Sequence, residues 1–326
     1  MEIIKITISR SAGAERLDKQ VALHNANLSR RQIKRFIDMG SVFVDGKRIR
    51  KASYQVVPPA VIEIRIEQNE EIENKGNQIH WSNLLIYKDE NLLAINKPAG
   101  IPTAPTRDSA VHNVYHYLKK SGILPSKFYP FHRLDKDTSG LLLIPLTHQM
   151  AQLLNSQMQN RRIRKTYFAI CQGNPTNSDW TVQGKISRSR RNSNFFKLTS
   201  QPEQDHVNSM SEFHLVNQHQ NPDLCLIEAN PLTGRTHQIR LHLAFSSLPI
   251  LGDSRYNLNP MPAAELNIPD QAYRMFLHCR KMSFYHPVKK ENFSLTAPLP
   301  EEFWQLIRIF FPEYSSEINT NAMPPE

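Results

Sequence analysis

The sequence contains no long apolar segment and no export signal. A membrane-spanning helix needs about 18 or more consecutive apolar residues, and the chain has no such run. Its first ten residues, MEIIKITISR, lack the basic start, apolar middle and small-residue cleavage site of a secretory signal peptide. These absences favour a cytoplasmic protein that does not use a membrane as a partner.

Cysteine is scarce as well. The 326 residues include three cysteines, Cys171, Cys225 and Cys279, which lie far apart in the sequence. An odd number of widely spaced cysteines suits reduced, buried thiols and provides neither a disulfide framework nor the paired spacing of a zinc site. The Pro-Cys-x-x-Cys signature of zinc-dependent nucleobase deaminases is also absent.

Acidic residues are the minority among the charged ones. Lysine and arginine number 40 against 30 aspartates and glutamates, so the formal net charge is +10. In residues 1–66 basic residues outnumber acidic ones by 13 to 6. This balance favours a polyanionic partner. With 40% apolar residues, the chain is long enough for a sizeable core and a second, smaller domain.

The N-terminal part predicts a small α/β domain. Its hydrophobic periodicity predicts two helices, at residues 15–25 and 30–40, and strands at 41–49 and 61–66. Ser29 suits the N-cap of the second helix, and Asp45-Gly46 suits a tight turn. The basic side chains of the second helix either form a solvated face or bind a polyanion, and their pattern alone leaves both interpretations open.

The order of these parts, RLDKQVALHNANLSRRQIKRFIDMGSVFVDGKRIRKASYQV, resembles the S-four-type RNA-binding domain. The resemblance implies a domain over residues 1–67 that touches the RNA backbone through basic side chains, namely Arg30, Arg31, Lys34, Lys47 and Arg48. Such contacts release condensed counterions and position a protein without reading sequence.

The remaining chain predicts a larger domain. Residues 68–80 are polar and charged, which is typical of a linker. Residues 81–312 then alternate strands with helices, including a buried strand at 140–146 and a strand at 164–173. A helix is expected from Asp108 or Ser109 onward. Residues 313–326 are expected to form a disordered tail.

One stretch, FHRLDKDTSG at residues 131–140, is rich in charged residues although apolar segments lie on both sides of it. Three interpretations of Asp135 and Asp137 are open. They could be structural, with Asp137 in a turn and Asp135 in an ion pair, or they could bind a divalent metal. Alternatively, one of them could act as a nucleophile or base. The neighbouring Arg133 and Lys136 disfavour the metal. We prefer a turn role for Asp137, because Asp-Thr-Ser-Gly is ordinary turn chemistry.

A second stretch, LTGRTHQIR at residues 232–240, supplies an arginine. Gly234 allows a tight turn, and Arg235 stands where a helix is expected to begin. A buried guanidinium needs an acidic partner, and Asp135 is the natural one. Such pairing would favour the ionised carboxylate at neutral pH. A purely structural ion pair fits the same residues.

Several motifs together resemble the RluA-type pseudouridine synthases. They are NKPAGIPT, HRLDKDTSGLLLI, RKTYFAI, PLTGRTHQIRLHLA, PILGD and LHCRKMSFYHP. The resemblance implies an α+β fold, with a mostly antiparallel, bisected sheet and the active cleft across its middle. It also implies isomerisation of uridine to pseudouridine in RNA, with neither a cofactor nor a metal. One departure is that the family's Leu-His-Ala is Leu-His-Cys here, at Cys279.

The resemblance assigns roles to single residues. Asp135 is the essential aspartate, acting on the ribose either as nucleophile or as base. Arg133 takes the place of the extruded base, Tyr167 stacks on the uracil, and Arg235 pairs with Asp135. Substrate contacts are also implied for Lys165 and Ile239.

Other functions remain as alternatives. A non-catalytic RNA-binding assembly factor would share the basic domain, although the implied site is complete here. A glycosidase would need a second acid, which we do not find. Ribosomal large-subunit RNA is the favoured substrate and transfer RNA the alternative, and we expect a monomer.

Overall fold

The computed structural model describes residues 2–25, 28–39, 41–66, 70–106, 111–188, 196–199 and 207–315. The chain divides into two compact units. Unit 1 comprises residues 1–81 and 101–124, and unit 2 comprises residues 82–100 and 125–326. The segment 101–124 thus groups with unit 1, whereas the sequence assigns it to the larger domain. No helix in the described ranges is long and apolar enough to cross a membrane.

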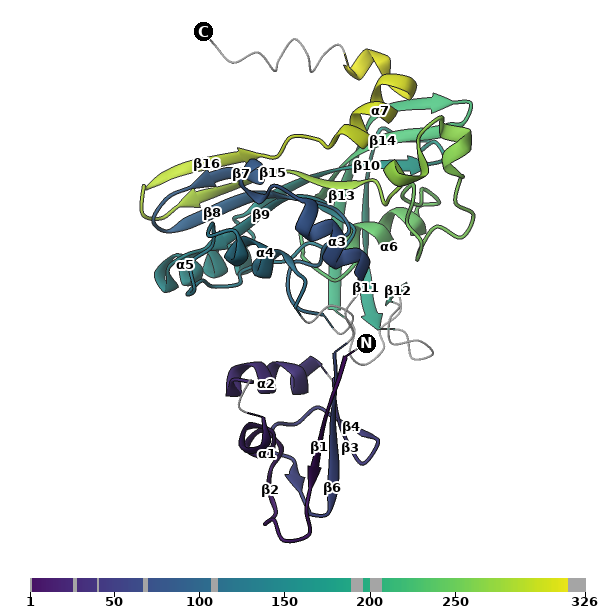
Figure 1. The fold of residues 1–326 in the computed structure, drawn as a ribbon. Coiled ribbons are helices and arrows are strands. Elements are labelled where there is room, and N and C mark those ends of the chain that lie inside the picture. The colour runs from purple at the N-terminus through teal and green to yellow at the C-terminus, as the bar shows by residue number, and fades with distance from the viewer. Residues whose placement is uncertain are drawn as a thin grey trace. The chain divides into compact units, whose positions relative to one another are not determined.

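Unit 1 contains the two helices predicted near its start, packed on a four-stranded antiparallel sheet in the order β1-β6-β3-β4 (Figure 1). Its elements are β1 (Glu2–Ile8), β2 (Glu15–Arg16), α1 (Leu17–His24), α2 (Arg30–Met39), β3 (Val42–Val44), β4 (Lys47–Ile49), β5 (Gln55–Val56) and β6 (Ala60–Ile66). β2 and β5 form a separate pair. Three apolar side chains of α2 are buried, those of Ile33, Phe36 and Ile37.

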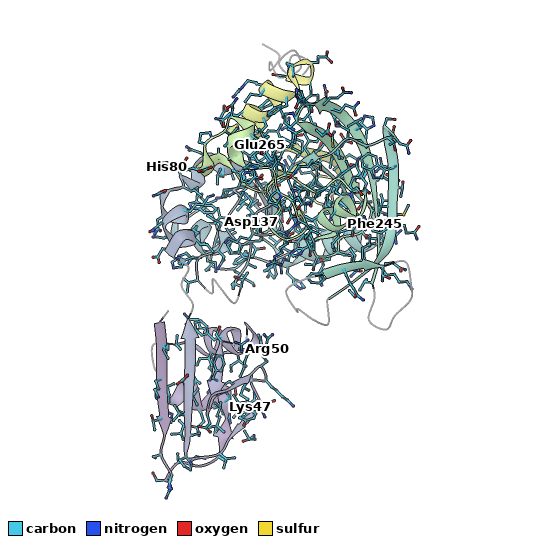
Figure 2. All side chains as sticks on the ribbon, turned by 90° about the vertical axis from the view of Figure 1, so that its right-hand side faces the viewer. Lys47, Arg50, His80, Asp137, Phe245 and Glu265 are labelled. Atoms are coloured by element: carbon cyan, nitrogen blue, oxygen red, sulfur yellow. The ribbon has the colours of Figure 1, made fainter. Side chains whose placement is uncertain are left out.

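Local hydrogen bonds explain where these elements begin and turn. Before α2, Ser29 Oγ accepts the Gln32 amide at 3.3 Å, and Gln32 Oε1 accepts the Ser29 amide at 2.9 Å. This reciprocal cap confirms the predicted start. Between β3 and β4, Asp45 and Gly46 both adopt positive φ, which matches the two-residue hairpin turn that Asp-Gly favours. Lys47 starts β4 and is exposed (Figure 2).

The predicted linker contains a helix, α3 (Glu70–Gln78). Ile72 is buried, and Trp81 donates from its indole nitrogen to the carbonyl of Gly76 at 3.0 Å. The Trp81 ring stacks on Tyr117, with ring centroids 5.3 Å apart. The expected linker at residues 68–80 thus contains a helix, which is stabilised by one buried isoleucine and two aromatic rings.

Tyr117 belongs to α4 (Val114–Lys120). This helix begins later than the sequence suggests, because Asn113 caps it by accepting the His116 amide at 3.2 Å. The expected start, Asp108 or Ser109, lies outside the described residues.

Unit 2 is built on a ten-stranded sheet in the order β12-β11-β13-β14-β10-β15-β9-β8-β7, with β16 also paired to β15 (Figure 1). Of the strand pairs in the described ranges, β9–β15 alone is parallel. The strands are β7 (Leu85–Lys88), β8 (Leu92–Lys97), β9 (Ser139–Pro145), β10 (Arg164–Gln172), β11 (Asp179–Arg188), β12 (Phe196–Thr199), β13 (Val207–Gln220), β14 (Asp223–Pro231), β15 (Leu277–His286) and β16 (Glu291–Thr296). The predicted α+β class with a mostly antiparallel sheet is confirmed.

The helices of unit 2 are α5 (His148–Gln159), α6 (Gln238–Phe245) and α7 (Glu301–Phe310). Three short 3-10 helices accompany them, η1 (Trp81–Leu84), η2 (Ala263–Leu266) and η3 (Asp270–Ala272). Because η1 starts at Trp81, it spans the boundary with unit 1.

Strand β10 contributes to two apolar clusters, because successive side chains point to opposite faces of a sheet. Tyr167 and Ala169 belong to the cluster that also contains Ile239 of α6. Phe168 and Ile170 belong to the cluster that buries α7. This alternation places Tyr167 on the face of the sheet that carries α6.

The end of the chain differs from the prediction of a tail from residue 313. Tyr314 is half-buried and packs edge-on against Phe168, with ring centroids 6.0 Å apart. Its place in the α7 cluster extends the ordered domain by at least this residue. Residues 316–326, the rest of the predicted tail, lie outside the described residues.

Candidate active site

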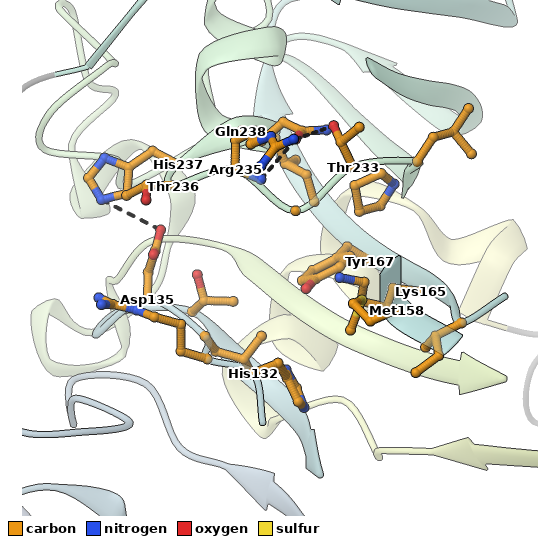
Figure 3. A pocket seen from close by; sticks show the side chains of 18 of the residues that line it. His132, Asp135, Met158, Lys165, Tyr167, Thr233, Arg235, Thr236, His237 and Gln238 are labelled. Atoms are coloured by element: carbon orange, nitrogen blue, oxygen red, sulfur yellow. Dashed lines mark hydrogen bonds and ion pairs between the residues drawn. The ribbon is translucent and has the colours of Figure 1, made fainter. Parts of the chain in front are cut away.

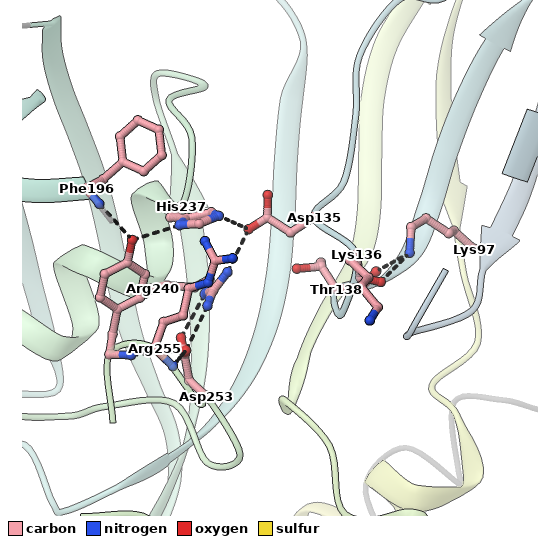
Figure 4. Close-up of polar contacts among 10 residues, drawn as sticks. Lys97, Asp135, Lys136, Thr138, Phe196, His237, Arg240, Asp253 and Arg255 are labelled. Atoms are coloured by element: carbon pink, nitrogen blue, oxygen red, sulfur yellow. Dashed lines mark hydrogen bonds and ion pairs between the residues drawn. The ribbon is translucent and has the colours of Figure 1, made fainter. Parts of the chain in front are cut away.

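Asp135 lies in the loop before β9, and buried groups hold the backbone of that loop. Lys97, at the end of β8, is 0% exposed. Its ammonium donates to the carbonyl of Pro98 at 2.8 Å. It also donates to the carbonyls of Lys136 at 3.0 Å and Thr138 at 2.9 Å (Figure 4). The loop is thus tied to the adjacent strand on both sides of its turn, which limits the positions that the Asp135 carboxylate can take.

The guanidinium that meets Asp135 belongs to Arg240, in the first turn of α6. Arg240 Nη1 donates to Asp135 Oδ2 at 3.3 Å (Figure 4). Its Nε and Nη2 donate to the two oxygens of Asp253, at 2.7 and 2.8 Å. Although burial opposes the charge, the hydrogen bonds and charge of Asp253 raise the pKa of Arg240, so that Arg240 stays cationic.

Arg235 does not pair with Asp135, so this part of the prediction is wrong. Its side chain is exposed, and its Nε donates to the carbonyl of Asn208 at 3.1 Å. The reason is the start of α6, which begins three residues later than expected, at Gln238. The buried Gln238 accepts the amide of Arg235 at 3.0 Å, which holds residue 235 in the preceding turn.

His237, the N-cap of α6, is a second neighbour of Asp135. It adopts a left-handed conformation with φ 56°, which is uncommon for a residue other than glycine. Its Nε2 lies 3.8 Å from Asp135 Oδ2, and its Nδ1 lies 2.7 Å from the hydroxyl of Tyr256. Burial lowers the pKa of His237 to about 4, so the ring is neutral at neutral pH. Within the described residues, both polar contacts of the carboxylate engage Oδ2, and Oδ1 has none.

Asp135 lines a cleft of about 590 Å³. Tyr167 and Lys165 project into it from β10 (Figure 3). Arg133, which is exposed, and Ile239, which is buried, also line it. Burial and the neighbouring Cys279 raise the pKa of Tyr167 well above its ordinary value, so the phenol is protonated at neutral pH.

All six residues predicted to act on the substrate line the cleft, and among them Arg133 and Arg235 are exposed. Asp137, by contrast, acts electrostatically on Arg274 instead of joining the Asp135 network. In the part of the chain that the structure describes, no group of three or more His, Cys, Asp or Glu side chains gathers as metal ligands would.

Of the five residues predicted to contact RNA, four have described side chains. Arg30, Lys34 and Lys47 are exposed. Arg48 is half-buried, with its guanidinium 5.0 Å from the centre of the Phe43 ring. The side chain of Arg31 lies outside the described part of the chain. The exposed cations on α2 and β4 are free of the core and can meet phosphates.

Sequence reasoning missed Arg240, His237 and Asp253. All three lie in stretches already singled out, since LTGRTHQIR contains His237 and ends at Arg240, and PILGD ends at Asp253. An arginine and an aspartate in separate motifs are a signal for an ion pair, but the spacing does not say which arginine is buried. His237 offered no signal, because its role depends on an unusual backbone angle.

Comparisons with known proteins identify the family and agree with this fold. The family profile for RNA pseudouridylate synthase matches residues 91–245, and the profile for the S4 domain matches residues 15–62. The uncharacterised RNA pseudouridine synthase YlyB of Bacillus subtilis is 30% identical, covering 94% of this chain and 98% of the relative. Ribosomal large subunit pseudouridine synthase D of Shigella flexneri is 31% identical, covering 96% and 97%.

A solved structure, human RNA pseudouridylate synthase domain containing 4, shares the fold with a TM-score of 0.56. It is 21% identical, and the match covers 73% of this chain and 96% of that one. The fold and cleft are therefore those of an RNA-modifying isomerase. The chain belongs to the RluA-like RNA pseudouridine synthases and carries an N-terminal S4 domain, an RNA-binding module.

Proposed function

We propose that the chain isomerises specific uridines in ribosomal large-subunit RNA, with Asp135 as the residue that acts on the ribose. The observation that carries the role of Asp135 is its contact with Arg240 inside the cleft, 3.3 Å from Nη1 to Oδ2. The choice of RNA is supported by the Shigella relative, a ribosomal large subunit pseudouridine synthase, because the match spans nearly the whole of both chains.

The geometry supports a division of labour around the carboxylate. Arg240 donates to Oδ2, and the neutral His237 lies 3.8 Å from the same oxygen, which leaves Oδ1 for the ribose as nucleophile or base. The phenol of Tyr167 stays protonated and therefore neutral, and its ring face is a surface on which the uracil can stack. Arg133, exposed at the cleft, is placed to fill the space that an extruded base leaves behind.

The S4 domain supplies an additional RNA contact that does not depend on the target base. Arg30, Lys34 and Lys47 are exposed on α2 and β4, and lysine and arginine contacts with phosphates add affinity without reading sequence. Target choice then rests on the RNA shape that presents a uridine to the cleft.

Mapping of pseudouridine tests this proposal. Ribosomal and transfer RNA are isolated from cells with the protein, from cells without it, and from cells that carry Asp135→Asn. We expect at least one large-subunit position to lose pseudouridine in the last two strains. Loss confined to transfer RNA would refute the proposed substrate, and retention of every site with Asp135→Asn would refute the role of Asp135.

A further inference from the structure

Lys165 is a cation that lines the cleft. The roles proposed for Asp135, Tyr167 and Arg133 do not explain why a cation lies there. Lys165 lies two residues before Tyr167 in β10, and both side chains line the cleft beside each other (Figure 3). Across the described residues no carboxylate reaches Lys165 within ion-pair distance, and its ammonium has no hydrogen-bond acceptor. Lys165 is half-buried, and an unpaired charge that has lost part of its hydration is costly, so this position carries a cost that packing does not explain.

The neighbours of Lys165 provide no negative charge. Cys279, across the strand pair on β15, has its pKa raised to about 12 by burial, so its thiol is protonated. His132 accepts the backbone N–H of Leu143 through Nε2 at 2.9 Å, which makes its ring neutral. Gly234 faces the ammonium without a side chain, since a Cβ there would lie 3.6 Å from Nζ.

The reaction itself creates a negative charge in the same place. When the C1′–N1 bond breaks heterolytically, its electron pair stays with the base, and the uracil becomes an anion shared over N1, O2 and O4. C5 then supplies the pair for the new bond to C1′. C5 loses its proton and N1 takes one up, so no atom is gained or lost. A base stacked on Tyr167 undergoes these steps beside Lys165.

We propose that the ammonium of Lys165 contacts the detached uracil and stabilises its negative charge, which makes Lys165 a catalytic residue. A fixed charge placed where negative charge develops acts strongly on that charge during the reaction. It needs no partner in the free enzyme, because the anion it serves exists only after bond cleavage. The inference rests on the proposed stacking of uracil on Tyr167.

The test compares Lys165→Met, Lys165→Arg and Arg164→Met. Arg164 is the adjacent exposed cation on the same strand and does not line the cleft, so its variant controls for the loss of one positive charge. The substrate is total RNA from cells that lack the protein. Two quantities are measured with enzyme in excess: the single-turnover rate of pseudouridine formation and the affinity for the RNA.

We expect Lys165→Met to lower the single-turnover rate on the order of 10²–10³-fold, as the loss of a charge-stabilising donor does. Its RNA affinity should match that of Arg164→Met. Lys165→Arg should recover part of the rate because it keeps the charge. The thermal midpoint of Lys165→Met should equal or exceed that of the wild type, because an unpaired, half-buried charge has been removed.

Three results would overturn the inference: a rate for Lys165→Met close to that of Arg164→Met, a defect confined to RNA affinity, or a midpoint that falls with the rate. Separate assay of the RNA classes keeps the two proposals apart. Wild-type activity on transfer RNA alone refutes the proposed substrate while the three variants still decide the role of Lys165. A wild type inactive on all RNA counts against both.

Discussion

Arg240 and Asp253 are joined by two hydrogen bonds, 2.7 Å from Nε to Oδ2 and 2.8 Å from Nη2 to Oδ1. Both side chains are buried, and the planar guanidinium fits the carboxylate along one edge. The pairing fixes the plane of Arg240 and leaves Nη1 directed at Asp135. Asp253 therefore positions the group that in turn positions the carboxylate of Asp135.

The first prediction separates the two arginines of the LTGRTHQIR stretch. Arg240→Lys should lose almost all activity, because a single ammonium cannot bridge Asp135 and Asp253 as a planar fork does. Arg235→Lys should keep far more, since Arg235 bonds a backbone carbonyl at the exposed rim. Pseudouridine yield on total RNA measures both variants. Equal loss in the two would contradict the assignment of Arg240 as the partner of Asp135.

The second prediction concerns the stability of the buried pair. Asp253→Asn leaves the Arg240 charge buried with only its weaker contact to Asp135, and loss of one partner from a buried pair costs about 3–5 kcal/mol. Urea denaturation should show this loss in the free energy of unfolding. Asp270→Asn, at an exposed aspartate, is the control and should change little. A stable Asp253→Asn protein would mean that the pair contributes nothing to folding.

The third prediction distinguishes the aspartates of the FHRLDKDTSG loop. Asp135→Asn should abolish pseudouridine formation while the fold and RNA affinity persist, because asparagine keeps the shape but supplies no carboxylate. Asp137→Asn should lose much less, since Asp137 acts on Arg274 and not on the Asp135 network. Circular dichroism confirms the fold of both. If Asp137→Asn were the inactive variant, the roles would be reversed.

Elements with strong periodicity could be predicted from the sequence. The strand at 139–145 is buried throughout, and the helix at 148–159 is capped by Thr147, so pattern and packing agree. The partner of Asp135 could not be predicted in the same way. The choice between Arg235 and Arg240 depends on the left-handed His237, which delays α6, and a single strained residue leaves no periodic signal.

Tertiary packing also overrode composition in the linker. The composition of residues 70–78 indicates a solvated connection, yet Ile72 is buried and Gly76 lies against Tyr117 from a distant part of the chain. A polar segment with one apolar side chain becomes a helix when aromatic residues elsewhere cover it, and that information lies outside the segment.

The fourth prediction tests the S4 domain. Lys34→Gln combined with Lys47→Gln should weaken RNA binding and make its dependence on salt shallower, by about 0.7–0.9 in logarithmic slope for each phosphate that is no longer neutralised. Both side chains are exposed, so the fold should persist. Binding curves at several salt concentrations measure the slope. As a control, Lys290→Gln removes an exposed cation from unit 2. An equal salt-dependence slope in the wild type and the double variant would exclude Lys34 and Lys47 from the RNA interface.

The last prediction follows from a histidine that is buried as a neutral ring. His242 in α6 is 0% exposed, its Nε2 lies 2.9 Å from the hydroxyl of Ser209, and burial lowers its pKa from 6.5 to about 4. Between these two values the unfolded chain binds a proton that the folded chain does not. The stability is therefore fully present above pH 6.5 and declines as the pH falls toward 4.

The slope from this one group should approach about 1.4 kcal/mol per pH unit. His242→Gln removes the titration but can still bond Ser209, so its free energy of unfolding should fall less steeply than that of the wild type over the same range. The buried Asp253 does not confuse the comparison, because its pKa is lowered from 3.8 and its loss of stability begins only at more acidic pH. Urea denaturation at intervals from pH 7 to pH 4.5 supplies both slopes. Parallel curves for the two proteins would show that His242 is already protonated in the fold, against the neutral ring that its burial implies.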